Sequence, residues 1–115
     1  MDNHYNHFKK IDAHSHIGKF GSPFNIDFDL QRLTEQMEAY NIEKTILCPA
    51  GCHLNEELKT AYQAAPDKII PLCWVNANEG QEAYDMLEHY LRDENFAGIK
   101  MQPLFDAFTA DSPLV

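Results

Sequence analysis

Strand-like and helix-like segments alternate along this chain, and this alternation restricts its fold more than any other feature of the sequence. The predicted strands cover residues 10–17, 44–50, 69–75 and 96–101. Between them, apolar residues recur at helical spacing at Leu30, Leu33, Met37 and Tyr40, at Leu54, Leu58, Ala61, Tyr62 and Ala65, and at Ala83, Met86, Leu87, Tyr90 and Leu91. Connections from strand through helix to parallel strand are right-handed, so the order predicts an α/β fold with a mostly parallel sheet.

Two architectures fit this pattern, and periodicity alone does not choose between them. Strands buried on both faces occur in open doubly wound sheets and in closed barrels. With 115 residues, the chain is less than half as long as a typical eight-stranded barrel of about 250 residues. The first loop between strand and helix contains no G-x-G-x-x-G or Walker-type motif, so no nucleotide site is predicted there.

Three segments depart from the regular pattern. A stretch rich in glycine, proline and asparagine follows the first strand, and we expect turns there, with Asp27 or Asp29 as the N-cap of the first helix. Pro71 cannot donate to a strand ladder, so regular pairing of the third strand is predicted to start only near Leu72. Residues 102–115 show no sustained periodicity.

The charge and cysteine content exclude several classes of function. The chain has 18 acidic and 9 basic residues, a net charge of -9, which disfavours nucleic-acid backbones and anionic membranes as partners. No stretch approaches the roughly 18 apolar residues that cross a bilayer. Three cysteines and no secretory signal pattern predict a reducing, cytoplasmic location.

The candidate metal site is a pair of histidines at the end of the first predicted strand. Residues two apart on a strand project to the same side, so Asp12, His14 and His16 share one face and the two imidazoles can converge on one ion. Asp12 could ligate or hold an imidazole tautomer. The alternative is a hydrogen-bonded histidine pair without metal. The position favours a site, because ligands gather at the C-terminal ends of parallel strands.

Three motifs resemble the amidohydrolase superfamily of metal-dependent (β/α)8 barrels. Residues 12–18 (DAHSHIG) are similar to its opening D-x-H-x-H-x-G. Residues 65–76 (APDKIIPLCWVN) resemble a stretch of the amidohydrolase-related branch that includes aromatic-acid decarboxylases. Residues 98–103 (GIKMQP) are similar to the G-I-K-L-H-P strand of that branch, with Gln102 in place of the histidine.

This resemblance implies that residues 1–115 form a single partial domain, the N-terminal portion of a TIM barrel with about three and a half βα units. It implies a divalent metal, zinc first and manganese second, which activates water or orients a carboxylated substrate. Further ligands in the superfamily come from the fifth and eighth strands. We therefore expect His14, His16 and Asp12 to supply only part of a metal site, and the chain alone to be inactive.

Other candidate groups carry weaker expectations. Lys100 corresponds to a position where some branches carry a metal-bridging carboxylated lysine; a structural or substrate-facing lysine is the favoured interpretation, and we take it as the candidate catalytic residue. Cys48, Cys52 and His53 are expected to be structural rather than metal ligands. Trp74 is expected in the core; the alternative is that it lines a pocket near the end of the third strand. His4, His7 and His89 are assigned no function.

Three functional hypotheses follow. The first is a metal-dependent hydrolase or decarboxylase acting on a small carboxylated or cyclic substrate. The second is a metal phosphoesterase of the TatD-like or polymerase and histidinol-phosphatase type, which also opens with D-x-H-x-H but suits the acidic charge less well. The third is a non-catalytic interaction module. In each case the unpaired edges of a half-barrel predict self-association or binding to a complementary half-barrel.

Overall fold

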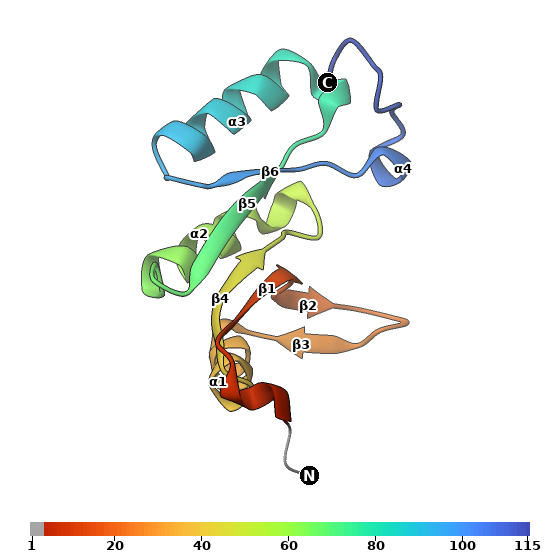
Figure 1. The fold of residues 1–115 in the computed structure, drawn as a ribbon. Helices are drawn as coiled ribbons and strands as arrows, with labels where there is room; N and C mark the ends of the chain where they lie inside the picture. The colour runs from red at the N-terminus through yellow and green to blue at the C-terminus, as the bar shows by residue number, and fades with distance from the viewer. Residues whose placement is uncertain (1–3) are drawn as a thin grey trace.

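The computed structural model describes residues 4–115, and its centre is a four-stranded parallel sheet (Figure 1). The strands are β1 (Lys10–Ser15), β4 (Ile42–Leu47), β5 (Ile69–Trp74) and β6 (Gly98–Lys100), in the spatial order β1-β4-β5-β6. The spatial order follows the chain order without the reversal that defines a doubly wound sheet. The sheet curls as half of a barrel, which confirms the predicted fold class and decides between the two architectures.

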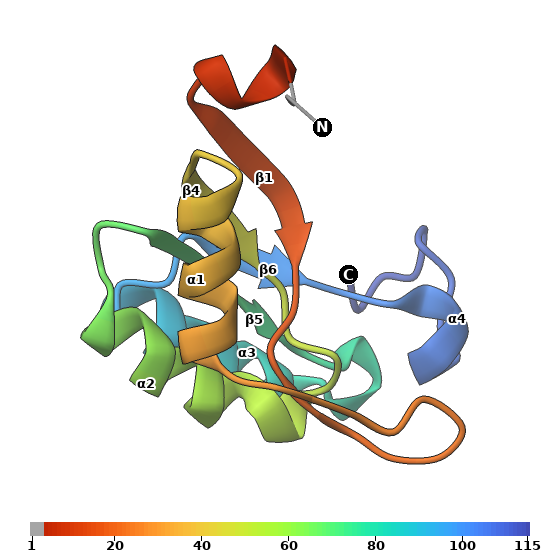
Figure 2. The ribbon, with the colours of Figure 1, turned by 90° about the horizontal axis from the view of Figure 1, so that it is seen from below.

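Three amphipathic helices cover one side of this sheet (Figure 2). They are α1 (Leu30–Ala39), α2 (Asn55–Ala64) and α3 (Gln81–Arg92). Asp29 is the N-cap of α1, because its Oδ1 accepts a hydrogen bond of 2.9 Å from the backbone N–H of Arg32. The apolar stripes predicted for the helices meet the outer face of the strands in one core, formed around Leu33, Met37, Leu47, Leu58, Ala61, Ile69, Cys73 and Tyr90.

The predicted strand boundaries need small corrections. β1 ends at Ser15, so His16 lies just beyond the strand, and β4 runs from 42 to 47 rather than from 44 to 50. The stretch after β1, where only turns were predicted, contains a hairpin of β2 (Gly18–Phe20) and β3 (Ile26–Phe28). Strands of three residues are too short to show an alternating pattern.

The prediction that pairing of the third strand starts only near Leu72 is wrong. β5 begins at Ile69, and Pro71 is opposite Leu47 in the parallel ladder with β4. The N–H and C=O of one strand residue point to the same side, and the Pro71 carbonyl accepts from the Ala97 N–H at 2.9 Å, on the β6 side. The proline therefore removes no donor from the β4–β5 ladder.

The tail after β6 is more ordered than its sequence predicted. Pro103–Asp106 form a single helical turn, α4, whose proline lies in the first turn, where no intrahelical N–H bond is lost. Ala107 follows with a positive φ of 55° and ends the turn. Three short 3-10 turns complete the fold, η1 (His4–His7), η2 (Cys52–Leu54) and η3 (Ala77–Glu79).

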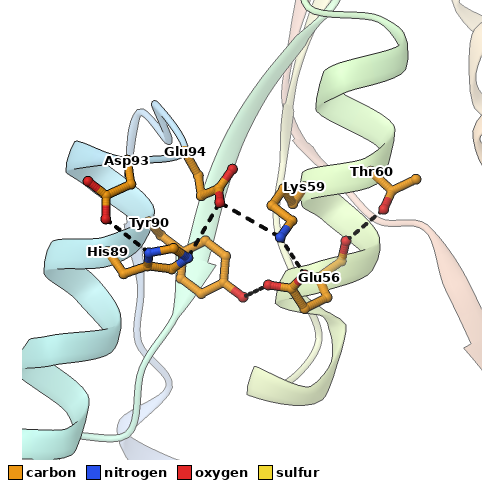
Figure 3. A network of polar contacts seen from close by, with 7 residues as sticks. All are labelled: Glu56, Lys59, Thr60, His89, Tyr90, Asp93 and Glu94. Atoms are coloured by element: carbon orange, nitrogen blue, oxygen red, sulfur yellow. Dashed lines mark hydrogen bonds and ion pairs between the residues drawn. The ribbon is translucent and has the colours of Figure 1, made fainter.

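A network of polar contacts joins α2 to the end of α3 (Figure 3). The buried Tyr90 donates its hydroxyl to Glu56 at 2.6 Å, and Lys59 lies 2.6 Å from Glu56 and 3.7 Å from Glu94. His89 lies between Asp93 and Glu94. Glu56 and Glu94 therefore take part in the contacts that join α2 to the end of α3.

The two edge strands leave apolar side chains open to solvent. Ile11 on β1 is 63% exposed and Ile99 on β6 is 38% exposed. Within residues 4–115, β1 pairs with β4 alone and β6 with β5 alone. In the same part of the chain, every helix is too short or too polar to cross a bilayer.

Candidate metal centre and pocket

A pocket of about 570 Å³ opens beside the C-terminal ends of β1, β5 and β6. It brings together residues from five segments of the chain: His14, His16, Pro49, Ala50, Trp74, Lys100, Gln102, Leu104 and Phe105. Parallel strands end at a common edge, which is why side chains far apart in the sequence meet there. The pocket contains three of the four predicted site residues, namely the histidine pair and Lys100, but not Asp12.

The two histidine rings converge as their spacing predicted. Nε2 of His14 lies 2.9 Å from Nε2 of His16. Nδ1 of His16 lies 2.7 Å from the backbone carbonyl of Cys48, and a carbonyl only accepts, so Nδ1 of His16 carries the proton. Nε2 of His16 is therefore the acceptor, and Nε2 of His14 the donor, of the 2.9 Å hydrogen bond between the two rings, and an ion held by both nitrogens would take the place of this hydrogen bond.

The surroundings of His16 favour its neutral form. Burial lowers the pKa of His16, and the positive charges of His14 and Lys100 lower it further, although the hydrogen bond to Cys48 acts in the opposite direction. A metal binds the neutral imidazole, so less free energy is needed to remove a competing proton.

Asp12 lies near the pair and supports it through the backbone. Its Oδ1 accepts a hydrogen bond of 3.0 Å from the N–H of His14, which fixes the chain where β1 ends. Asp12 is not among the residues that line the pocket. Within residues 4–115, no group of three or more histidine, cysteine, aspartate or glutamate side chains is arranged to hold a metal, so the pair supplies two ligands.

Lys100 is the cation of the pocket. It lies at the C-terminal end of β6 and faces the same space as the histidine pair. Its charge reaches Cys48 as well as His16: burial raises the pKa of the Cys48 thiol, and the charge of Lys100 partly offsets this effect. A lysine here can pair with a carboxylate placed beside a metal ion.

The sequence did not identify α4 as part of the opposite wall of the pocket. Trp74 is buried, as expected, but its Nε1 donates to Oδ2 of Asp106 at 2.8 Å, and its ring packs edge-on against Phe105 at 5.8 Å. Asn78 donates to the carbonyl of Asp106 at 2.6 Å. These contacts hold α4 against the pocket, where Leu104 is 93% exposed and Phe105 is 74% exposed.

The remaining candidates lie outside this site. Cys48 is buried and Cys52 is exposed, and neither forms a metal cluster with His53 within the described residues. His89 belongs to the network between α2 and α3. His4 and His7 lie in η1, before β1.

Comparison with known proteins shows similarity in structure rather than in sequence. No family model matches the chain, and no curated protein matches it significantly. The structure of 5-carboxyvanillate decarboxylase from Novosphingobium aromaticivorans, with bound manganese and 3-methoxy-4-hydroxy-5-nitrobenzoic acid, is similar, with a TM-score of 0.71 and 16% identity over 84% of this chain. The chain shares the fold of part of a decarboxylase. Two structures of 2,6-dihydroxybenzoate decarboxylase, one from Rhizobium and one complexed with 2,6-dihydroxybenzoate, each give a TM-score of 0.61 at 18% identity over 79% of the chain.

The fold that the three sequence motifs implied, part of a (β/α)8 barrel, is therefore confirmed by these decarboxylase structures. The chain spans 42%, 37% and 38% of the lengths of these three structures. At identities of 16% and 18%, the similarity to these structures shows the fold alone.

Proposed function

We propose that this chain forms the histidine-bearing part of a divalent-metal-dependent enzyme that decarboxylates or hydrolyses a small carboxylated or cyclic substrate. The observation that carries this proposal is the pair of imidazole Nε2 atoms, 2.9 Å apart at the mouth of a pocket that also contains Lys100. The neighbouring decarboxylase with bound manganese supports a metal of this kind.

The donor set of the site fits a divalent metal. At metal–nitrogen distances of about 2.0–2.1 Å, two ligands lie about 2.9 Å apart at right angles and about 3.4 Å apart in the tetrahedral arrangement usual for zinc, so the two Nε2 atoms, which lie 2.9 Å apart, would need to separate by about 0.5 Å for zinc. The backbone carbonyl of Cys48 already holds His16 in the tautomer whose Nε2 is unprotonated. When bound, zinc or manganese would polarise a substrate carboxylate or lower the pKa of a bound water.

The protein groups then have distinct roles. His14 and His16 would hold the ion, and Asp12 would keep the end of β1 in place through the His14 N–H. Lys100 would orient the substrate carboxylate by its charge, and Trp74 and Phe105 would form an apolar wall against a ring. The partners that we propose are a small-molecule substrate and additional protein that completes the barrel, in a cytoplasmic setting.

Metal binding tests this proposal directly. Equilibrium dialysis against zinc chloride or manganese chloride, followed by elemental analysis, should show metal retained by the chain, and the double variant His14→Ala with His16→Ala should lose it. The matched control is His4→Ala with His7→Ala, which removes two exposed histidines away from the pocket and should change nothing. Equal uptake by the chain and the His14/His16 double variant contradicts the proposed site.

A further inference from the structure

We propose that two copies of this chain close one eight-stranded barrel, in which the histidine pairs of both copies bind a single divalent metal ion. This inference rests on the proposed function, because it assigns the same histidines to the metal. It adds the partner and the source of the missing ligands.

The edges of the sheet provide the first argument. Within residues 4–115, β1 and β6 each pair on one side only, and the backbone N–H and C=O groups on the other side are a template for another strand. Each edge also exposes an isoleucine, Ile11 on β1 and Ile99 on β6, and pairing of the two edges would bring these apolar side chains toward each other. Both strands therefore gain hydrogen bonds and apolar contact from the same pairing.

The topology of the sheet provides the second argument. The four strands are parallel, follow one another in chain order and curl in one direction. A two-fold axis along the centre of the curl pairs β6 of each copy with β1 of the other, with all strands still parallel. The result has eight strands, the number at which a parallel α/β sheet closes with a filled interior. Because the symmetry is closed, association stops at two copies.

The charges at the two edges are complementary. Lys9 and Lys10 lie at the start of β1, whereas Asp93 and Glu94 precede β6. A parallel pair aligns the starts of its strands, so these opposite charges would lie near each other. Within one copy, Lys9 already lies 3.9 Å from Glu43, and Asp93 and Glu94 contact His89, so attraction between the edges would compete with these contacts. The net charge of -9 on each copy opposes association overall, and salt screens this long-range repulsion.

Closure also completes the metal site. Eight strands about 4.8 Å apart with a tilt of about 36° enclose a barrel about 15 Å across, so imidazoles reaching inward from opposite walls can share one ion. The two copies of β1 would stand on opposite walls. Their histidine pairs would supply four nitrogen ligands, whereas each copy alone offers two within the described residues.

The test measures mass and metal content together. The 115-residue chain, loaded with zinc chloride and freed of excess metal by gel filtration, should sediment at twice its 13.2 kDa mass and contain one zinc per two chains. Ile11→Lys should shift it to the monomer and weaken zinc binding at least tenfold. Phe24→Lys, a substitution of an equally exposed apolar residue on the β2–β3 hairpin, should change neither. Ile99→Lys tests the other edge, and circular dichroism checks that each variant folds.

The alternative results have separate meanings. A monomer that holds one zinc per chain overturns the shared site but supports the proposed function. A dimer with one zinc per chain, or one that withstands both Ile11→Lys and Ile99→Lys, also overturns it. A dimer whose metal content is zero contradicts both proposals. A chain that dimerises only with a different protein assigns the edges to a complementary half-barrel and overturns the second-copy proposal.

Discussion

Replacing Tyr90 by phenylalanine removes a single hydroxyl from the contact between α2 and α3. That hydroxyl donates a 2.6 Å hydrogen bond to the Glu56 carboxylate, while the ring packs against Phe96 at a centroid distance of 4.8 Å. Tyr90→Phe keeps the ring and its packing. The change in the free energy of unfolding therefore reports the hydrogen bond.

The expected cost at pH 7 is about 1 kcal/mol. Hydrogen bonds to charged groups contribute about 1.5–3 kcal/mol when both partners are shielded from water. The Glu56 side chain is 63% exposed and regains water when the hydroxyl is removed, so the value falls below that range. For a domain of this size, 1 kcal/mol corresponds to a fall of about 4 °C in Tm.

The loss of stability caused by Tyr90→Phe should also depend on pH, and it should become smaller as Glu56 is protonated. Hydrogen bonds from Lys59 and then from Tyr90 lower the pKa of Glu56 below its ordinary 4.5. A lowered carboxyl pKa stabilises the fold fully above the unfolded value, and this stabilisation is lost as the pH falls through the folded pKa. Below this lowered pKa the bond to Glu56 weakens, and there Tyr90→Phe should cost about half as much as at pH 7.

Urea unfolding of the metal-free chain, followed by circular dichroism at a series of pH values from pH 7 downward until the chain unfolds, measures how the cost changes. Tyr84→Phe is the matched control, because Tyr84 lies on the same helix and is 57% exposed; it should change stability by less than about 0.5 kcal/mol. If the cost of Tyr90→Phe is the same throughout this series, or at pH 7 is no larger than that of Tyr84→Phe, the assignment of the hydrogen bond is wrong.

Two further substitutions test the pocket and the core. Asp106→Ala should change the emission of Trp74, the single tryptophan of the chain, because it removes the partner of Nε1; unchanged emission, relative to Asp111→Ala, would mean that α4 is not held against the pocket. Leu58→Ala should lower the free energy of unfolding by about 2–5 kcal/mol in urea, because Leu58 is fully buried, whereas the half-exposed Leu91→Ala should cost much less; similar losses for both would place the core elsewhere.

The regular part of the fold could be predicted because it depends on local periodicity. The spacing of Leu33 and Met37 and that of Leu58 and Ala61 placed two helices correctly, and the alternation of elements predicted the parallel sheet. The histidine pair could be predicted for the same reason, since residues two apart on a strand are neighbours by geometry alone. Its metal remains a prediction.

The missed features depend on contacts between distant segments. Trp74 and Asp106 are 32 residues apart, and nothing in the neighbourhood of either residue signals their hydrogen bond. Pro71 was misjudged because its effect depends on which neighbouring strand its backbone faces. The partner of Nδ1 of His16 was also hidden, because it is the main chain of another strand end.

That last contact has a consequence for how the site tolerates sequence change. Any residue that keeps the same backbone path offers a carbonyl to His16, so the identity of the side chain at position 48 does not matter to the ring. The tautomer of His16 is therefore determined by the position of the backbone at residue 48 and not by the side chain of that residue. Substitution of Cys48 by another small residue should leave the hydrogen bond to His16 intact. A search for related sites that compares side chains alone would not detect this contact.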